Sequence, residues 1–251
     1  MRKGRRGLGN QVDGIERRIR HKSGALDNLS DLGNLRLFMQ RKLQPELLDS
    51  LPHDHPDALH NRRDLRITNH VLGHYRWFAR TLRRHATPGD RVLELGAGTG
   101  ELGAYLAARG HSTDGLDLWP RPPSWAPECE WHRADLLKFE RYADYAVITG
   151  NLILHQFNSE QLAALGEKIR PTARLILACE PLRRRASQTL FAALGPLLGA
   201  NHVSLHDAHV SIAAGFQADE LPQLLGLNRP EWTYRCQPTL LGSYRMMAWR
   251  A

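Results

Sequence analysis

The sequence predicts an α/β protein built around a doubly wound, mostly parallel sheet. Residues 91–100 read RVLELGAGTG, so an apolar run with the length of a buried strand turns into closely spaced glycines. A helix is expected directly afterwards, over 102–109, and the acidic Asp117 closes the next apolar run roughly 20 residues further on. A strand, a glycine-rich turn, a helix and a second strand in this order are typical of a nucleotide-binding unit.

The glycine-rich turn allows two interpretations. Glycine lets the backbone approach a ligand where any side chain would collide, and Asp117 is placed to hold two ribose hydroxyls. One interpretation uses the G-x-G-x-x-G pattern and predicts an NAD(P)-dependent oxidoreductase; its glycines are Gly98, Gly100 and Gly103. The other ends the strand at Leu95, so that the turn begins at Gly96, reads G-x-G-x-G and leaves Glu94 inside the strand.

The second interpretation resembles motif I of the class I S-adenosylmethionine (SAM) dependent methyltransferases, and GNLILHQF at 150–157 resembles their segment after the fourth strand. The resemblance spans roughly residues 89–251 and points to the type 11/12-like group of uncharacterised bacterial small-molecule methyltransferases. It implies a Rossmann-like sheet of seven strands with an antiparallel last strand, and SAM as the cofactor. In this family the acid at Glu94 anchors the loop and the amino-acid end of SAM, and an acid at Asp135 accepts from the adenine amine. The residues expected to contact or frame SAM are Glu94, Gly96, Ala97, Gly98, Gly100, Asp117, Leu118, Asp135, Leu136 and Asn151.

The other elements follow in the order of this family. Strand-like runs are expected at 112–118, 129–133, 145–149, 173–181, 231–236 and 242–250. Helices are expected from Ser159 and over about 185–198. The resemblance implies that the last two runs form a terminal strand hairpin added to the doubly wound sheet.

Residues 39–88 predict a helical cap ahead of the glycine loop. Apolar side chains recur there mostly at intervals of three or four residues, from Leu65 to Leu82, and Gly73 predicts a break between two helices. The resemblance implies that such helices cover the cofactor and form one wall of the substrate pocket. The pocket candidates are therefore Asn69, His70, Tyr75 and Trp77. The alternative is that Tyr75 and Trp77 simply pack on the sheet.

The expected chemistry is methyl transfer governed mainly by alignment. The methyl carbon of SAM sits on a positively charged sulfur and is already reactive, so the enzyme mainly aligns the acceptor and excludes water. A hydroxyl or phenol acceptor also benefits from a general base, and histidine suits that role near neutral pH. His155, just beyond the 145–149 strand, is the first catalytic candidate, and the adjoining Gln156 is a substrate-binding candidate. The alternative is that His155 only caps or packs a helix start.

LHDAHVS at 205–211 supplies the second catalytic candidate. It resembles an HDA-x-VS element of uncharacterised bacterial members of this methyltransferase group. An Asp beside a His orients or charges the imidazole, so Asp207 makes His206 a candidate base or substrate partner. The pattern VSLHDAHVSI favours loop and strand over helix, and there is no nearby cysteine; a zinc site is disfavoured and no metal is predicted. Such a site would use His202, His206 and His209.

Missing motifs favour a small-molecule acceptor. Enzymes that methylate exocyclic amines of bases or glutamine usually carry an N/D-P-P-Y/F turn after the fourth strand, and GNLILHQF has none. Methylation of cytosine carbon needs a Pro-Cys pair there, which is also missing. We therefore expect a small molecule rather than nucleic acid, with a hydroxyl or phenol oxygen favoured and carbon as the alternative.

The composition predicts a soluble, cytoplasmic protein with a basic amino-terminal arm. No apolar run among the 251 residues approaches the ~20 residues of a membrane helix, and three scattered cysteines predict buried free thiols. The net charge is +8, and residues 1–38 carry nine Lys/Arg against four Asp/Glu, with too few apolar residues to form a core. This segment is expected to be a flexible arm. The alternatives are a targeting element, a tether to an anionic membrane and a tether to nucleic acid. A tether to nucleic acid would imply a nucleic-acid-modifying methyltransferase.

Three regions are therefore expected. Residues 1–38 form the arm, 39–88 the helical cap and 89–251 the SAM-binding catalytic domain. A further hypothesis places the biological start at Met39, where helix-compatible sequence begins.

Overall fold

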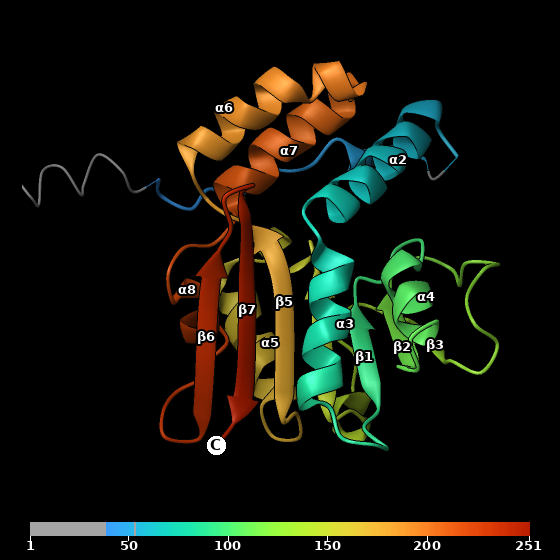
Figure 1. Ribbon diagram of the computed structural model, residues 1–251, viewed down its shortest axis with the longest axis vertical. Coiled ribbons are helices and arrows are strands. Elements are labelled where there is room, and N and C mark those ends of the chain that lie inside the picture. The colour runs from blue at the N-terminus through green and yellow to red at the C-terminus, as the bar shows by residue number, and fades with distance from the viewer. Residues whose placement is uncertain (1–38, 53) are drawn as a thin grey trace, which may run out of the picture. The chain divides into compact units, whose positions relative to one another are not determined.

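Seven strands form one sheet in the structure, a computed structural model that describes residues 39–52 and 54–251. The strands are β1 (Val92–Leu95), β2 (Thr113–Asp117), β3 (Trp131–Arg133), β4 (Val147–Asn151), β5 (Leu175–Pro181), β6 (Trp232–Pro238) and β7 (Ser243–Arg250). Their order across the sheet is β3-β2-β1-β4-β5-β7-β6. The first five strands pair in parallel, whereas β7 runs antiparallel to both β5 and β6 (Figure 1). The predicted seven-stranded, mostly parallel sheet with an antiparallel last strand is confirmed.

Helices lie on both faces of the sheet and above the carboxyl ends of its parallel strands (Figure 1). The α-helices are α2 (Pro56–Val71), α3 (His74–His85), α4 (Glu101–Ala107), α5 (Ser159–Ile169), α6 (Arg185–Leu194), α7 (His202–Ala214) and α8 (Glu220–Leu224). The short 3-10 helices are η1 (Leu48–Ser50), η2 (Arg141–Asp144), η3 (Leu154–Gln156) and η4 (Pro196–Leu198).

Alternating side chains of the central strands supply the two apolar layers. On β4, Val147 belongs to the cluster that contains Phe78 and Leu82 of α3. The next residue, Ile148, belongs to the other cluster, with Leu162 of α5. Successive strand residues point to opposite faces, so both faces of β4 are buried.

Gly73 separates α2 from α3, as the sequence predicts. It adopts a φ of +66°, a left-handed conformation that favours glycine. The two helices differ in what they bury: Phe78 and Leu82 of α3 pack into the core, whereas Leu65 and Val71 of α2 remain exposed. Apolar residues that share one spacing in the sequence therefore serve two different surfaces.

The segment around LHDAHVS corrects the sequence prediction. Loop and strand were favoured there, but His202–Ala214 forms α7. Asn201 caps this helix, because its side chain accepts a hydrogen bond from the Ser204 N–H. Asp207 and Val210 lie on its buried face at helical spacing. Val210, Ser211 and Ile212 alternate apolar and polar residues as a strand does, and this hides the helical period in the sequence.

The predicted basic arm, residues 1–38, lies outside the described residues. Residues Arg41–Ala251 form one unit, and the site lies within it. Among the described residues, no helix combines the length and apolar character needed to cross a membrane. The cysteines are free; Cys129 and Cys179 are buried, whereas Cys236 is partly exposed.

Candidate active site

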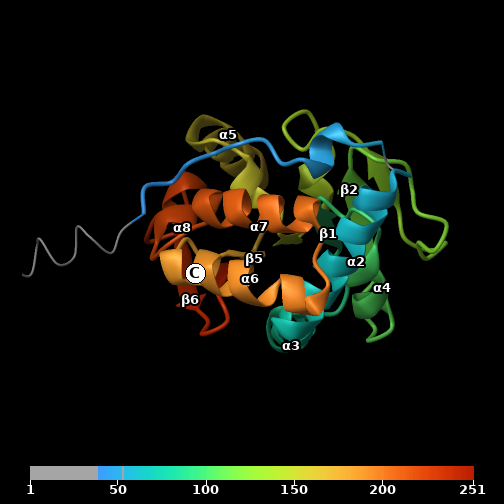
Figure 2. The same cartoon turned by 90° about the horizontal axis from the view of Figure 1, so that it is seen from above.

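A cavity of about 380 Å³ lies at the carboxyl ends of the central strands. Its wall combines the loop after β1, the ends of β4 and β5, and side chains of α2, α6 and α7. Figure 2 looks onto these three helices over this end of the sheet. In doubly wound sheets this edge is where ligands bind, at the point where strand connections diverge to opposite faces.

The glycine loop exposes its backbone to the cavity. Gly96, Gly98 and Gly100 adopt φ angles of +61°, +54° and +83°, where other residues are strained. A Cβ at Gly96 would lie 2.5 Å from Ile153, and one at Gly100 would lie 2.8 Å from Trp125. A Cβ at Gly98 would meet nothing closer than a backbone oxygen at 4.0 Å. Gly98 therefore faces open space.

Asp117 at the end of β2 holds this loop. Its Oδ2 accepts from the Gly98 N–H (2.8 Å) and its Oδ1 accepts from the Trp119 N–H (2.8 Å). Leu118, next to it, is 63% exposed and leaves an apolar surface beside the carboxylate. Asp117 therefore orients the loop itself.

The predicted cofactor residues divide into two groups. Half of them line the cavity: Glu94, Gly96, Ala97, Gly98 and Asn151. The other half lie outside its wall: Gly100, Asp117, Leu118, Asp135 and Leu136. Asp135 accepts from the Leu137 N–H (2.8 Å) after β3, and Leu136 packs in the core.

Glu94 on β1 is a buried acid that lines the cavity. Burial raises its pKa well above the usual range; a hydrogen bond from the Gly103 backbone opposes this shift, and Glu101 and Asp117 add to it. Its Oε2 has no hydrogen-bond partner among the described residues. Because an orphaned buried oxygen is costly, this atom marks a place for a donor group of a ligand.

A buried polar network reaches the cavity from the end of β4. The Nδ1–H of His74 donates to Asn69 Oδ1 (2.9 Å) and Asn151 Oδ1 (3.0 Å), and Asn151 Nδ2 also donates to Asn69 Oδ1 (3.0 Å). His74 Nε2 then accepts from Ser243 Oγ at 2.5 Å. Burial, with a smaller contribution from Arg245, lowers the pKa of His74 to about 4, so the ring is neutral.

The predicted pocket residues on α2 and α3 have different surroundings. Asn69 and Tyr75 line the cavity, and burial raises the pKa of the Tyr75 hydroxyl. Trp77 does not line it and packs edge-on against Phe78, with ring centroids 5.1 Å apart. His70 is exposed and outside the cavity wall.

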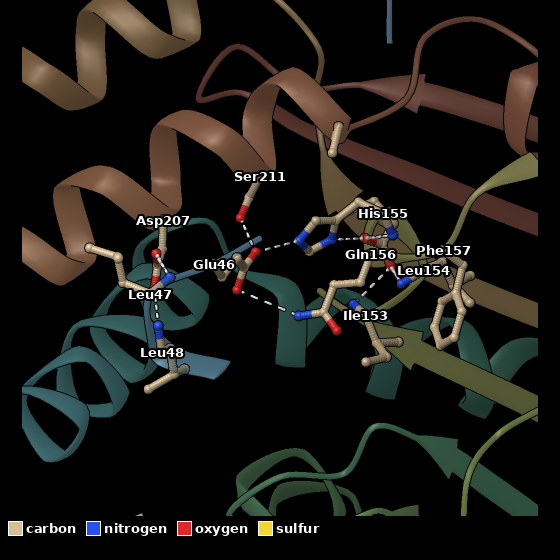
Figure 3. Close-up of polar contacts among 12 residues, drawn as sticks. Glu46, Leu47, Leu48, Ile153, Leu154, His155, Gln156, Phe157, Asp207 and Ser211 are labelled. Carbon is tan, nitrogen blue, oxygen red and sulfur yellow. Dashed lines mark hydrogen bonds and ion pairs between the residues drawn. The ribbon is translucent and has the colours of Figure 1, made fainter. Parts of the chain in front are cut away.

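His155 in η3 lies between two carboxylates, one of which is labelled in Figure 3. Its Nδ1 is 2.7 Å from Glu180 Oε2 on β5, and its Nε2 is 3.2 Å from Glu46 Oε1. Glu180 also accepts from the N–H groups of Ile153 and Leu154 through Oε1. The buried imidazole is therefore engaged at both nitrogens.

These contacts keep His155 protonated at neutral pH. Burial by itself lowers the pKa of His155, but the hydrogen bonds and charges of Glu180 and Glu46 raise it to about 9. Burial raises the pKa of Glu46, yet contacts with His155, Ser211 and Gln156 bring it below its usual value. A general base needs a free nitrogen, and His155 offers none in this arrangement. The sequence suggested His155 as a general base, but in this structure both of its ring nitrogens are already engaged by carboxylates.

Glu46 reaches His155 because residues 41–51, which we call the strap, run alongside α7 (Figure 2). Asp207 accepts from the N–H groups of Leu47 (2.7 Å) and Leu48 (3.1 Å). Arg41, at the start of the strap, donates to the carbonyl oxygens of His155, Phe157 and Ala214. The strap is thus tied to both α7 and η3.

The HDA-x-VS element turns Asp207 and Ser211, rather than His206, toward the cavity. Both of these residues line it, and Ser211 Oγ donates to Glu46 (Figure 3). His206 is exposed, with Nδ1 3.1 Å from Asp207 Oδ1, and lies outside the cavity wall. Gln156 lines the cavity and its Nε2 is 3.5 Å from Glu46 Oε2. In the part of the chain that the structure describes, no three His, Cys, Asp or Glu side chains are grouped to hold a metal ion.

Glu46, Asn61 and His74 also line the cavity, although they were not among the residues predicted from the sequence. Asn61 carried a weak signal, because it lies four residues before Leu65 on a helix whose apolar spacing was recognised. Glu46 carried none, since no motif or periodicity surrounds it.

No family model and no curated protein match this sequence. Solved structures do match it. The plantazolicin methyltransferase BpumL, in complex with a triazolic desmethylPZN analog and SAH, has a TM-score of 0.62 at 13% identity, covering 81% of this chain and 93% of that one. The pyocyanin biosynthetic protein PhzM has a TM-score of 0.53 at 17% identity, covering 79% of this chain and 60% of that one. Magnesium protoporphyrin IX methyltransferase (ChlM) from Synechocystis PCC 6803 with bound SAM has a TM-score of 0.50 at 15% identity, covering 76% and 84%. This chain therefore has the fold of the class I methyltransferases.

Proposed function

We propose that this protein is a SAM-dependent methyltransferase that transfers a methyl group to an oxygen, a hydroxyl or a phenol, of a small-molecule acceptor. The observation that carries the proposal is Gly98. Its N–H is held by Asp117, its missing side chain leaves open space, and it faces a cavity at the carboxyl end of β1. Two solved structures of the same fold hold SAM or SAH.

The residues around this loop fit SAM. The partnerless Glu94 Oε2 would accept from the ammonium of the methionine part. Asp117 lies just outside the cavity wall, and its carboxylate would accept from the ribose hydroxyls in addition to the Gly98 and Trp119 N–H groups. Exposed Leu118 offers an apolar surface for the adenine, with Asp135 as the acceptor for its amine. Bound SAM supplies a methyl group on a positively charged sulfur.

The protein's own residues orient the acceptor and keep water out. Asn151 is fixed by Asn69 and His74 and presents its amide at the cavity wall, where Tyr75 also lies. We assign these side chains to positioning the acceptor oxygen. We assign His155 to positioning as well, because its protonated ring joins the strap to the end of β5. Alignment with a reactive methyl group then provides most of the rate enhancement.

The oxidoreductase alternative relied on Gly103 as the third glycine of the dinucleotide fingerprint. Gly103 lies in α4 against Trp125, where a Cβ would be 2.5 Å from the indole ring. Internal packing therefore accounts for this glycine. The nucleic-acid alternative depends on residues 1–38; it predicts salt-sensitive binding of RNA or DNA that is lost when they are deleted.

Calorimetric titration with SAH tests the proposal. Gly98→Ala and Gly110→Ala are a matched pair, because both glycines have positive φ (+54° and +81°) and neither Cβ would meet a side chain within 4 Å. Both variants should lose similar stability, but only Gly98→Ala should weaken SAH binding, by about tenfold or more. NADH serves as the control ligand. Binding of NADH in place of SAH, or equal SAH affinity in both variants, would contradict the proposal.

A further inference from the structure

The cavity has an acidic end that the proposed SAM site does not use. Asp64 of α2, Asp207 of α7 and Glu46 of the strap all line it. Glu180 lines it too, and it shares the protonated His155 with Glu46, at 2.7 and 3.2 Å, so one of these two negative charges is balanced. The cavity wall beside α7 therefore holds four carboxylates against one imidazolium.

The contacts of these carboxylates leave their negative charge largely in place. Asp64 Oδ2 accepts from Ser204 Oγ (2.7 Å), and Asp207 accepts backbone N–H groups of the strap. Asp64 has two further partners outside the cavity wall, the half-exposed Arg63 at 3.4 Å and the His60 ring at 3.6 Å. The arginines that do line the cavity, Arg62 and Arg66, contact groups next to the glycine loop instead: Arg62 lies 4.2 Å from the centroid of the Trp119 ring, and Arg66 pairs with Glu101 at 3.3 Å. Neutral donors orient a carboxylate without cancelling its charge, so the potential at this end is negative.

Asn61 adds an independent sign of a ligand. It is 3% exposed, lines the cavity on α2 and has an Oδ1 without any hydrogen-bond partner in the described part of the chain. Its Nδ2 is 3.4 Å from Asp207 Oδ2, which sets the orientation of the amide and leaves the oxygen as the orphan. A buried acceptor without a donor is costly, so we expect an N–H group of a ligand to donate a hydrogen bond to Asn61 Oδ1.

Apolar side chains make up most of the remaining wall. Leucines and a valine of α2, α6 and η4 line the cavity and remain partly exposed: Leu65, Val71, Leu190, Leu194 and Leu198. An uncovered apolar lining of this kind is typical of a site for an apolar ligand body.

We propose that the acceptor is an amphiphile with a protonated amine, whose apolar body lies along α2 and α6 and whose ammonium is held by Asn61 and Asp64, with Asp207 beside them. This inference rests on the proposed methyltransferase function and names its substrate class. The ammonium supplies the N–H donor for Asn61 and the positive charge that the carboxylates favour. The ammonium serves as an anchor, because a nitrogen that keeps its proton has no lone pair to attack a methyl group. The methyl goes to an oxygen elsewhere on the molecule: a new O–CH3 bond forms, the bond from the methyl to the SAM sulfur breaks to leave SAH, and the O–H proton is released to solvent.

Three probes of equal chain length test this substrate class on the full chain saturated with SAH. Decylamine is protonated at pH 7, as a lysine side chain is, whereas decan-1-ol is neutral and decanoate is an anion. Calorimetry should show decylamine binding about tenfold more tightly than decan-1-ol, and decanoate more weakly than either. Asp64→Asn, which keeps an acceptor for Ser204, should reduce decylamine affinity about tenfold and leave decan-1-ol unchanged.

Asp57→Asn is the matched control, because Asp57 lies on the same helix but outside the cavity wall, and it should leave all three affinities unchanged. Equal binding of the three probes, no binding of decylamine, or an unchanged decylamine affinity in Asp64→Asn would overturn the inference. Failure of the methyltransferase function itself would show separately, as a lack of SAH binding in the first titration.

Discussion

His155 Nδ1 lies 2.7 Å from Glu180 Oε2, and this pair joins η3 to the carboxyl end of β5 inside the protein. The two residues are 25 positions apart, and Glu46, 109 positions before His155, completes the cluster from the strap. A charged group is stable in such a buried place only when it is paired. The cluster therefore couples the position of the strap to the wall of the cavity.

The first prediction concerns pH. The pKa of His155 is raised in the folded protein from 6.5 to about 9, so its contribution to stability is complete below about pH 6.5 and is lost as pH rises through about 9. His155→Gln should lower the free energy of unfolding by about 3 kcal/mol near pH 6 and remove most of this alkaline decline. Denaturant unfolding between pH 6 and 10 measures both effects. His206→Gln, at an exposed site, is the control; the same alkaline slope in wild type and His155→Gln would contradict the assignment.

The second prediction separates loop support from general stability on β2. Asp117→Ala removes the acceptor of the Gly98 and Trp119 N–H groups, so it should cost about 1–3 kcal/mol and reduce SAH affinity at least tenfold. Asp114→Ala is the matched control, because Asp114 lies on the same strand as Asp117 and its carboxylate accepts from the Glu130 N–H (2.8 Å) rather than from the glycine loop. It should destabilise the protein and leave SAH affinity unchanged. A similar loss of affinity in both variants would show that Asp117 acts only through folding.

The third prediction concerns two neighbours on α7. Asp207→Ala leaves the Leu47 and Leu48 N–H groups without their acceptor, so hydrogen exchange at these amides should become about tenfold faster or more. His206→Ala should not change their exchange. The His206 side chain is exposed, and its contact is with Asp207 Oδ1 (3.1 Å) rather than with either amide. Amide exchange followed by mass spectrometry or NMR measures this. Slow exchange in Asp207→Ala would mean that the strap is held by its other contacts.

The fourth prediction concerns Gly103, where two effects oppose each other. Alanine has a helix propensity about 1 kcal/mol better than glycine, but a Cβ at Gly103 would lie 2.5 Å from the Trp125 ring. We expect the clash to prevail, with a net loss of about 1–3 kcal/mol in Gly103→Ala. In a Trp125→Leu background the same change should cost less, since the ring is gone. Equal costs in the two backgrounds, measured by denaturant unfolding, would show that Trp125 is not the obstacle.

Much of the fold could be predicted from the sequence because its signals are local. The strand before Gly96 and the break at Gly73 each follow from residues close together in the chain, whereas the terminal strand hairpin was expected from the family resemblance. A continuous apolar run, a glycine that tolerates positive φ and a capping residue act over a few positions. The helix α7 was missed for the same reason, because its local pattern resembles alternation and its packing partners on α2 and the strap are more than 100 residues away.

By itself, the sequence determined the first strand, the glycine loop and the acid at the end of β2, since these depend on local backbone geometry within one strand-turn-helix-strand unit, and such a unit is typical of a doubly wound sheet. Only the tertiary structure decided which polar side chains meet in the cavity. It brought Glu46 against His155 and Asn61 beside Asp207, and it left His206 at the surface. The physical reason is that a pKa or an orphaned hydrogen-bonding atom depends on burial and on neighbours from distant segments, which no local pattern specifies.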